Sequence, residues 1–203
     1  MNDNNILGVV LAGGKSKRFG EDKNLAKLGN ITLLEHVLKK VTKKFNKTLI
    51  ISNQNLNIKK LNSVTIVPDC IQGNLGPLVG VLTAMKWIKK NNEKYQWVAT
   101  FPCDTPFFDI SMIDEVKRIS KKNIKKLYFL KSGEKRHNIF GLWSIQLKDI
   151  LEKDINNNFR KVEEWADKIG LETININHEK FDSFLNINTK EDLEEAKKNL
   201  DKI

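Results

Sequence analysis

The sequence has 203 residues and a net charge of +10, and its size and composition exclude several classes of protein. The length suits one domain, residues 1–203, with a sizeable hydrophobic core. No apolar run approaches the length of a membrane span, and the first residues lack the basic-then-apolar layout of a signal peptide. Two cysteines are too few for a disulfide framework. We therefore expect a cytoplasmic protein that works away from membranes.

The positive charge raises the question of nucleic-acid binding. The lysines occur largely as pairs along predicted helices, such as Lys39-Lys40 and Lys197-Lys198, where they would form solvated faces. No zinc-finger, RRM or KH motif accompanies the charge. A nucleic-acid binder would show a steep salt dependence of its affinity, and we expect no nucleic-acid partner. The excess positive potential would instead steer anionic small molecules to the protein.

The first predicted strand starts at Ile6 and leads into a glycine-rich, basic loop. Its two adjacent valines are typical of a strand buried on both faces of a parallel sheet. Gly13-Gly14 ends the run, and glycine lets backbone N–H groups approach phosphate oxygens. Arg18 and Lys23 then supply the charge that a polyphosphate needs. The alternative is a glycine-rich turn with a solvated basic face. Spacing excludes both the P-loop and the G-x-G-x-x-G fingerprint.

Helices and strands alternate along the next hundred or so residues. This order predicts an α/β fold, a doubly wound, mostly parallel sheet with helices on both faces. Ligands of such sheets bind beyond the carboxyl ends of the strands, so a polar residue that follows an apolar run is a site candidate. The expected elements are a helix over 31–45, strands over 48–51 and 64–67, a helix over 82–90, and a strand over 96–101.

Two candidates follow the third predicted strand. Asp69 comes directly after the strand, although Pro68-Asp69 could simply turn the chain. Gly76 and Gly80 lack side chains where a helix begins, so a bulky or anionic ligand could approach the helix N-terminus.

Asp104 is the strongest single candidate. It follows the fourth predicted strand between Pro102 and Pro106, so its backbone has little freedom. A carboxylate in this position suits Mg²⁺, which prefers carboxylate and phosphate oxygens. The alternative is a turn or helix-capping aspartate. Cys103 beside it is expected to be a small core residue.

The second half of the sequence is less explicit. His137 precedes a predicted strand over 139–143, and we expect an exposed histidine in a basic turn, with phosphate binding as the alternative. Asn156 is expected to open a helix that runs to about Lys168. Thr189 and Asp192 resemble a helix cap. The remaining expected elements are a helix over 112–120, strands over 126–130 and 172–176, and an alternating segment over 184–189 that places two asparagines on one face.

Four ordered motifs resemble those of nucleotidyltransferases that make molybdenum cofactor dinucleotides. The first is L-A-G-G-x-S-x-R-M-G-x-D-K, matched from Leu11 to Lys23 with Phe19 in place of methionine. The others are G-P-L-x-G over 76–80, P-C-D-x-P-F over 102–107 and F-x-N-I-N-T over 184–189. The family generally has His-Pro before G-L-W, where this sequence has His137-Asn138.

The resemblance implies a molybdenum cofactor guanylyltransferase with a Rossmann-like nucleotidyltransferase fold. Such enzymes use Mg²⁺ to transfer GMP from GTP to the terminal phosphate of molybdopterin bearing molybdenum, and they release pyrophosphate. Molybdoenzyme chaperones are further expected partners. By this resemblance Asp104 is the metal ligand, and Arg18, Lys23 and Asp104 are catalytic. The implied GTP site comprises Leu11, Ala12, Gly13, Gly14, Lys23, Asn53, Asp69 and Asp104, and the implied pterin site comprises Gly76, Gly80, Arg160, Asn186 and Asn188.

The chemistry can also be argued from the residues. A phosphomonoester acceptor is largely dianionic at neutral pH, since its second pKa is about 6, and it needs no general base. No Ser-His-Asp or Cys-His relay can be assembled from the sequence. Mg²⁺ on Asp104, with Arg18 and Lys23, would relieve the repulsion between two anionic substrates.

Two other functions remain open at this point. A cytidylyltransferase of the same fold would act on a cofactor or an alcohol phosphate, but those relatives more often show L-A-A-G where this sequence has L-A-G-G at 11–14. A nucleotide-binding regulatory module without catalysis has less need of a rigid carboxylate such as Asp104. Asn188 could also serve only to assist the predicted helix cap.

Overall fold

A seven-stranded sheet organises the part of the chain that the computed structural model describes, residues 3–13, 25–56, 58–59, 61–73, 75–91, 93–121, 125–176 and 182–202. The strand order is β5-β4-β1-β6-β8-β7-β9, and β8 runs antiparallel to both of its neighbours while the other pairs are parallel. The predicted doubly wound, mostly parallel sheet is confirmed. The strands are β1 Ile6–Leu11, β4 Thr48–Ile51, β5 Val64–Val67, β6 Trp97–Pro102, β7 Leu127–Ser132, β8 Lys135–Ser144 and β9 Glu172–Asn175.

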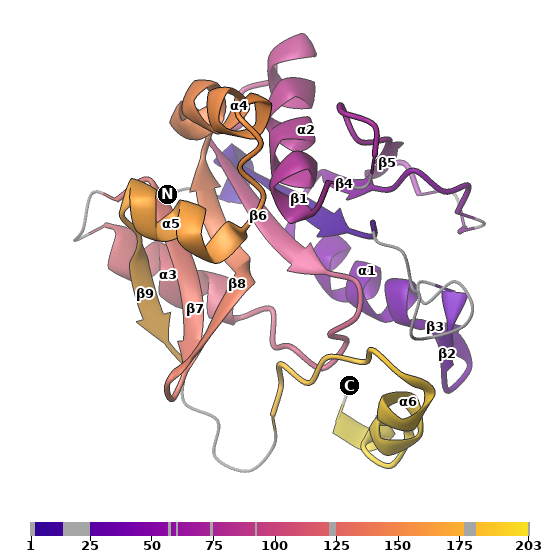
Figure 1. Cartoon of the computed structure of the whole chain (residues 1–203). Coiled ribbons are helices and arrows are strands. Elements are labelled where there is room, and N and C mark those ends of the chain that lie inside the picture. Colours follow the sequence, from indigo (N-terminus) through magenta and orange to yellow (C-terminus); the bar gives the residue numbers. More distant parts are fainter. Residues whose placement is uncertain are drawn as a thin grey trace.

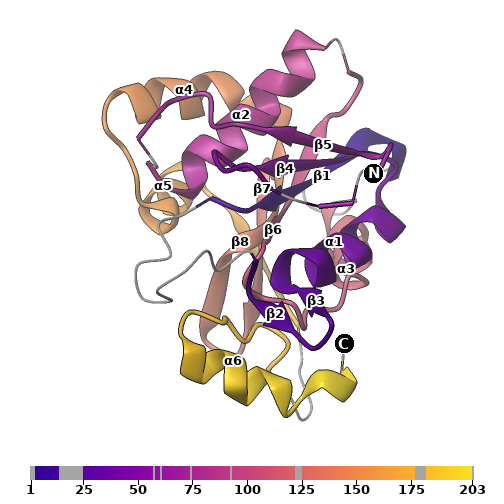
Figure 2. The same cartoon turned by 90° about the vertical axis from the view of Figure 1, so that its right-hand side faces the viewer.

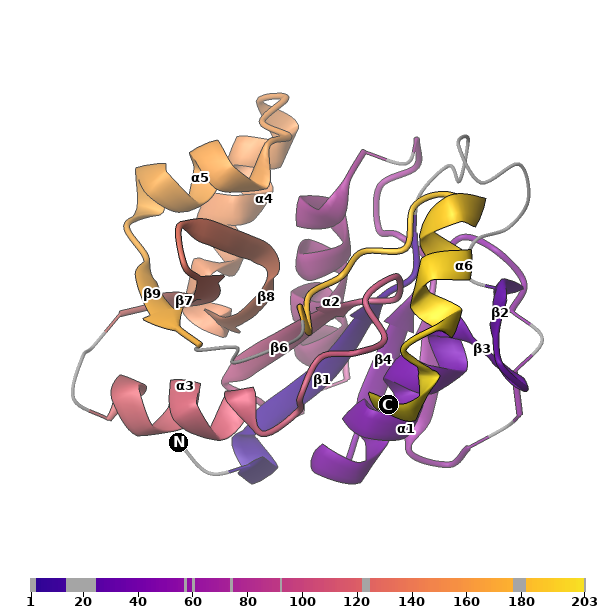
Figure 3. The same cartoon turned by 90° about the horizontal axis from the view of Figure 1, so that it is seen from below.

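Helices cover both faces of this sheet. Figures 1 and 3 show α2, α4 and α5 on one face and α1 and α3 on the other. No described helix is long and apolar enough to span a membrane. The helices are α1 Leu33–Lys44, α2 Pro77–Lys90, α3 Met112–Ser120, α4 Lys148–Asn156, α5 Val162–Ile169 and α6 Lys190–Lys197, with short 3-10 helices at Asp3–Asn5, Ile145–Leu147 and Leu200–Lys202.

The strand β1 shows why the sheet has two cores. Successive side chains of a strand point to opposite faces. Ile6 and Val10 accordingly pack in the core beneath α1 and α3, whereas Leu7 and Val9 pack in the core beneath α2, α4 and α5. All four side chains are almost fully buried. The continuous apolar run in the sequence is therefore the consequence of burial on both faces.

A third, smaller core holds the end of the chain. Ile187 and Ala196 pack with Leu28, Leu33 and Phe107. This cluster joins α6 to the two-stranded hairpin of β2, Lys27–Leu28, and β3, Ile31–Thr32, and Figure 2 shows these elements together at one end of the molecule. The predicted cap of the last helix is confirmed, because the Thr189 hydroxyl accepts from the Asp192 amide at 3.1 Å.

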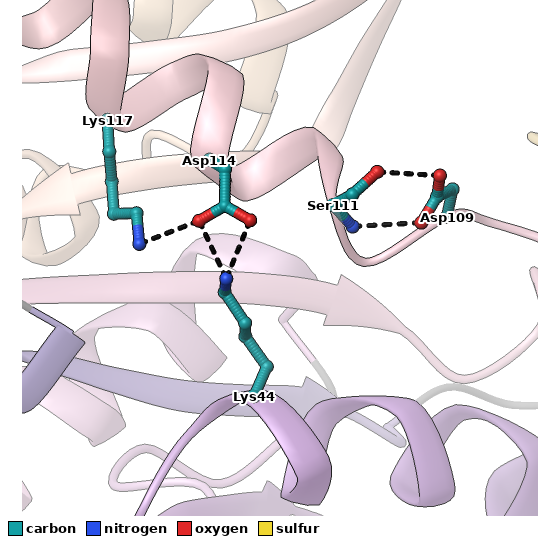
Figure 4. A network of polar contacts seen from close by, with 5 residues as sticks. All are labelled: Lys44, Asp109, Ser111, Asp114 and Lys117. Carbon is teal, nitrogen blue, oxygen red and sulfur yellow. Dashed lines mark hydrogen bonds and ion pairs between the residues drawn. The ribbon is translucent and has the colours of Figure 1, made fainter.

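Charged side chains also join α1 to α3 on their shared face of the sheet (Figure 4). Lys44 of α1 and Lys117 of α3 lie 2.6 and 2.8 Å from Asp114. Partial burial raises the pKa of Asp114, but the two lysines outweigh it and hold the pKa below its ordinary value. Because Asp114 is half exposed, such pairs contribute little to stability. This pair provides a control for Lys40, a lysine of the same helix that bonds two backbone carbonyls.

Several predicted boundaries are wrong. The helix expected from Asn156 to about Lys168 corresponds to α5, which begins six residues later, at Val162, because Asn156 is the last residue of α4. Asn158, between them, has a positive φ of 65°, which a helix does not accommodate. The helix α4 is not predicted from the sequence, and α2 begins at Pro77, five residues before the expected start at 82. The segment 184–189 forms no strand, and Phe184 lies in a turn.

Candidate active site

A cavity of about 250 Å³ lies at the carboxyl edge of the sheet. It is bounded by the ends of β1, β4 and β6, by the residues that follow β5, and by the first turn of α2. This is the edge at which doubly wound sheets bind their ligands. The lining residues are Leu11, Gly13, Ile51, Asp69, Gly76, Pro77, Gly80, Pro102, Cys103, Asp104 and Ile139.

The cavity gathers six of the predicted site residues. Four of them, Leu11, Gly13, Asp69 and Asp104, come from the expected GTP set, and the other two are the glycines of α2. Ile139 lines the cavity as well, although no sequence motif singled it out. The predicted roles of these residues stay predictions, but the structure brings their positions together.

The end of β1 is held by backbone hydrogen bonds to both neighbouring strands. The Ala12 amide donates to the Ile51 carbonyl at 3.0 Å, and the Leu11 carbonyl accepts from the Cys103 amide at 3.3 Å. The Ala12 side chain is fully buried. Gly13 follows, exposed, and a Cβ built on it would meet no described protein atom within 4 Å. A side chain at 13 would thus reduce the space for a ligand without disturbing the protein.

Asn53 and Asp69 form a mutual pair beside the cavity. The Asn53 amide donates to an Asp69 carboxylate oxygen at 2.8 Å, and the Asp69 backbone N–H donates to the Asn53 side-chain oxygen at 2.9 Å. Burial raises the pKa of Asp69 above its ordinary value, and the hydrogen bond from Asn53 opposes that effect. The pair joins the ends of β4 and β5 and fixes the direction of the carboxylate.

Asp104 lies half-buried just past the end of β6. Its carbonyl accepts from the Ile187 amide at 2.9 Å, so the C-terminal segment crosses directly over this loop (Figure 3). The hydroxyl of Thr105 lies 3.2 Å from Asp104 Oδ1 and also donates to Asn186 Oδ1. The structure therefore places one residue of the expected pterin set next to the predicted metal ligand.

Lys40 of α1 also contacts the loop that carries Asp104, a contact that no pattern in the sequence indicates. Its ammonium donates to the carbonyls of Pro106 at 2.8 Å and Phe108 at 2.9 Å, and it lies 5.3 Å from the centre of the Phe108 ring. Burial lowers the pKa of Lys40, and nearby Asp109 partly offsets this. The expectation that Lys39-Lys40 forms a solvated face is wrong for Lys40, which is half-buried.

Glycine is favoured for different reasons at Gly76, just before α2, and at Gly80, within its first turns. Gly76 precedes the helix with a positive φ of 94°, a conformation that favours glycine. At Gly80 a Cβ would come within 2.8 Å of Leu11 Cδ2, so glycine lets α2 pack closely on β1. Apart from Pro77, the first turn of α2 therefore faces the cavity with glycine backbone, and a helix N-terminus favours anions.

Comparison with known proteins decides the family. The model of the MobA-like NTP transferase domain matches residues 8–169. The chain belongs to this family.

Full-length relatives agree with that assignment. A molybdenum cofactor guanylyltransferase of Nitrobacter hamburgensis is 29% identical over 193 residues, with 94% of this chain and 92% of the relative covered. One from Haemophilus influenzae is 30% identical over 192 residues, with 94% and 97% covered. The predicted membership of the molybdenum cofactor guanylyltransferase family is confirmed.

A solved structure shares the fold. Molybdopterin-guanine dinucleotide biosynthesis protein A of Archaeoglobus fulgidus matches with a TM-score of 0.77 at 23% identity, over 97% of this chain and 100% of that one. The Rossmann-like nucleotidyltransferase fold predicted for the sequence is thus the fold of the MobA-like NTP transferases.

Three of the predicted site residues, all in the motif from Leu11 to Lys23, cannot be placed. Gly14, Arg18 and Lys23 lie outside the described residues, so their expected roles at the phosphates stay sequence-based.

Arg160 and Asn188, both expected on the pterin side, have local partners. Arg160 donates to the carbonyls of Ile155 at 2.6 Å and Phe159 at 2.8 Å, beyond the end of α4. Its own carbonyl lies 3.9 Å from the Cβ position of Gly76, so its backbone borders the cavity. The backbone N–H of Asn188 donates to the Asp192 carboxylate at 2.8 Å, and the side-chain cap of α6 comes from Thr189. Asn188 thus assists the cap through its backbone.

His137 is buried, and the expectation of an exposed histidine is wrong. Its side chain is 8% exposed, stacks on Phe184 with ring centres 3.7 Å apart, and shares a 2.7 Å hydrogen bond with the Ser132 hydroxyl. The residue sits within the long strand β8, whose pairing with β7 shifts register between Phe129 and Leu130. In place of the usual proline, Asn138 accepts from the Arg136 guanidinium at 2.7 Å. His137 thus anchors the C-terminal segment against β8.

The donors at the cavity fit Mg²⁺ bound together with a nucleotide. Among the described residues, no group of three His, Cys, Asp or Glu side chains could hold a metal ion by itself. Mg²⁺ commonly binds through one or two carboxylates and completes its octahedron with waters and substrate phosphates. Asp104 offers such a carboxylate on the cavity wall, and Asp69 lines the same cavity.

Proposed function

We propose that this protein transfers GMP from GTP to the terminal phosphate of molybdopterin bearing molybdenum, which gives the guanine dinucleotide form of the cofactor and pyrophosphate. The observation that carries the proposal is the cavity, in which residues of three of the family's four motifs meet at one edge of the sheet. The names of the full-length relatives support the same reaction. We place the reaction in the cytoplasm, as the composition of the sequence suggests, and the family resemblance points to molybdoenzyme chaperones as receivers of the product.

The nucleotide half of the cavity is assigned to the ends of β1, β4 and β5. Gly13 leaves open space beside the end of β1, since its Cβ position meets no described protein atom within 4 Å. The related cytidylyltransferases more often have alanine at this position, and a purine base needs more room than a pyrimidine. The Asn53–Asp69 pair presents a fixed carboxylate to the nucleotide from the far side.

The acceptor half is assigned to the first turn of α2 and the C-terminal segment. A helix N-terminus attracts anions, and the acceptor ends in a phosphate. None of Arg160, Asn186 and Asn188 lines the cavity itself, but the Arg160 carbonyl lies beside Gly76, and Asn186 is exposed beside the Asp104 loop. The two substrates would meet at Asp104, which lies between the two halves.

The reaction suits a site without a general base. Neither of the two histidines in the described chain lines the cavity: His36 bonds the Leu28 carbonyl, and His137 stacks on Phe184. A dianionic phosphate acceptor can attack directly, so positioning and charge stabilisation supply the catalysis. Asp104 would hold Mg²⁺, which neutralises phosphate charge when it is bound. Lys40 and Ile187 would keep the Asp104 loop in place, and α2 would orient the acceptor phosphate.

Nucleotide selectivity tests the proposal. Calorimetric titration with GTP, CTP, ATP and UTP in the presence of Mg²⁺ should give the tightest binding for GTP, and GTP with molybdopterin should release pyrophosphate. A Gly13→Ala variant should melt like the wild type yet lose GTP affinity, because the added methyl occupies ligand space. Tighter binding of CTP than of GTP by the wild type would contradict the proposal.

A further inference from the structure

Ile139 lines the cavity, although it belongs to neither of the expected substrate sites. Its side chain is half-buried, and it is a member of none of the three cores that the described residues form. A large apolar side chain is ordinarily placed where packing removes its surface from water. The described part of the fold does not use Ile139 in this way, so its apolar surface is available to a ligand in the cavity.

A bulge in β8 brings Ile139 to this place. The register of β7 with β8 skips residues 138–140, which lie between the pairs Phe129–Gly141 and Leu130–His137. The pairing of β6 with β8 stops at Gly141, whereas β6 itself continues to Pro102. Bulges bend a strand and re-aim its side chains, and they are frequent beside active sites. Ile139 therefore leaves the sheet register next to the carboxyl end of β6.

A buried hydroxyl fixes the backbone of the bulge. Thr100 of β6 is fully buried, and its Oγ1 donates to the Ile139 carbonyl. The same oxygen accepts from Trp143 Nε1 at 2.8 Å, so the tryptophan of the G-L-W segment holds the hydroxyl in place. A carbonyl that has left the sheet register needs another donor. The Thr100 hydroxyl is that donor, and it thereby sets the position of Ile139.

Ile139 lies on the acceptor side of the cavity. The strands β6, β1 and β4 lie between β8 and β5, and β5 leads to Asp69 of the nucleotide half. Two close neighbours of Ile139 in the sequence, His137 and Phe140, pack on the Phe184 ring, with ring centres 3.7 and 5.0 Å apart. Phe184 belongs to the C-terminal segment, which is assigned to the acceptor. The bulge is thus built against the acceptor half of the site.

We infer that Ile139 is a specificity-determining residue that packs against the ring system of the acceptor, with Thr100 and Trp143 as positioning residues. The acceptor of the proposed reaction is a phosphate joined to a pterin ring system. In-line displacement at phosphorus places the attacking and leaving oxygens on opposite sides, so the body of the acceptor extends away from the leaving pyrophosphate. Pro102 and Ile139, from adjacent strands, offer a flat ring an apolar surface. This inference rests on the proposed function and adds recognition of the ring to recognition of the phosphate.

Steady-state release of pyrophosphate tests the contact. Ile139→Ala should raise the KM for molybdopterin about tenfold and Ile139→Val about two- to fourfold, because the loss follows the apolar carbon removed from the contact. The effect should fall on this KM and not on kcat, and the calorimetric affinity for GTP should change less than about twofold, as expected for lost binding of one substrate. Ile150→Ala is the matched control, since Ile150 is exposed on α4 outside the cavity.

The hydroxyl of Thr100 is tested by two variants. Thr100→Val removes the donor to the Ile139 carbonyl and should raise the same KM with little change in kcat, whereas Thr100→Ser keeps the hydroxyl and should restore the KM. Thermal melting shows whether Thr100→Val still folds. If it does not fold, the Ile139 variants alone decide the inference.

A binding measurement without turnover uses neopterin, a fluorescent pterin that has no phosphate. The protein is first loaded with Mg²⁺ and the α,β-methylene analogue of GTP, which cannot be split at the reacting bond. The wild type and Ile150→Ala should quench neopterin equally, and Ile139→Ala should need about tenfold more protein for the same quenching. Absence of quenching by the wild type would overturn the ring contact.

The outcomes separate the ring contact from the function on which it rests. An unchanged KM for molybdopterin in Ile139→Ala, or a loss of GTP affinity in its place, would overturn the inference. Equal KM values in the wild type and a folded Thr100→Val would overturn the positioning role of Thr100. If the wild type releases no pyrophosphate from GTP and molybdopterin, the proposed function fails, and neopterin binding then decides whether Ile139 contacts a pterin ring.

Discussion

The two halves of the candidate site are built in different ways. On the nucleotide side, Leu11 ends a strand of the sheet and Asp69 and Asp104 come just after strands, and sheet hydrogen bonds fix where each strand ends. On the acceptor side, Arg160 and Asn186 lie on connecting segments that are held by side-chain contacts. The pairing of strands in the sheet is enough to place a strand end, whereas a connecting segment needs side-chain contacts to hold its position. The nucleotide half is therefore expected to tolerate loss of individual contacts, and the acceptor half to depend on them.

The sharpest test of this division is Asp104, which belongs to both halves. Asp104→Asn should abolish transfer and leave the fold intact, because loss of a metal-binding carboxylate costs several kcal/mol of transition-state stabilisation. Steady-state turnover with Mg²⁺ and thermal melting provide the measurement. Asp114→Asn is the control, since Asp114 bonds Lys44 and Lys117 outside the cavity and should keep near wild-type turnover. An Asp104→Asn variant that turns over like the wild type would remove this residue from the mechanism.

Lys40 tests whether the Asp104 loop needs its support from α1. Lys40→Met should lower turnover about tenfold, equivalent to about 1.4 kcal/mol, because the carbonyls of Pro106 and Phe108 lose their charged donor. Lys44→Met removes the exposed contact from the same helix to α3 and should change turnover little. Equal losses in the two variants would show that α1 is needed for general stability and not for the loop.

Arg160 tests the acceptor half. Arg160→Lys should raise the apparent constant for the pterin substrate several-fold and leave GTP binding almost unchanged, because lysine cannot reproduce the planar fork of arginine. The same fork donates to Ile155 and Phe159, so the variant should also lose about 1 kcal/mol of stability. Kinetics in both substrates and chemical denaturation distinguish the two effects. A loss of GTP affinity with unchanged pterin affinity would reverse the assignment of the halves.

Asp69→Asn is expected to change the free energy of unfolding only slightly. Burial raises the pKa of Asp69, so ionisation of this carboxyl destabilises the folded protein. The free energy of unfolding is unaffected below the unfolded pKa, falls as the pH rises between the unfolded and folded pKa values, and stays lowered above the folded pKa. Asp69→Asn should therefore stabilise the fold at neutral pH by about 0.5 kcal/mol, with no gain at low pH, while GTP affinity falls. Denaturation curves at neutral and acidic pH check the sign. Destabilisation at neutral pH would indicate that the carboxylate supports the fold.

The same division explains what the sequence could predict. Asp69 and Asp104 follow apolar runs, so the rule for strand ends locates them from the order of residues alone. Thr105 and Lys40 bond partners that lie 81 and 66 residues away in the sequence, and no local pattern announces such contacts.

The wrong predictions, of a helix start at Asn156 and of an exposed His137, have specific physical causes. Asn156-Asn157-Asn158 looked like the start of a helix because asparagine is a good cap residue, but asparagine also tolerates the positive φ that separates α4 from α5. His137 looked exposed because its neighbours are basic, and its ring is covered by Phe184, 47 positions later in the sequence. Fold class follows from periodicity, whereas burial of a single polar residue depends on distant parts of the chain.

The crossing of the C-terminal segment over the Asp104 loop has a consequence for synthesis on the ribosome. Translation adds about 5–20 residues per second, and 81 positions separate Thr105 from Asn186. The loop that carries Asp104 is therefore made roughly 4–16 s before its partner segment exists. A nascent chain in that interval has Asp104 but not the Ile187 amide that bonds the Asp104 carbonyl. Premature termination shortly before residue 184 would therefore release a chain that carries all seven strands of the sheet but lacks this contact to the Asp104 loop.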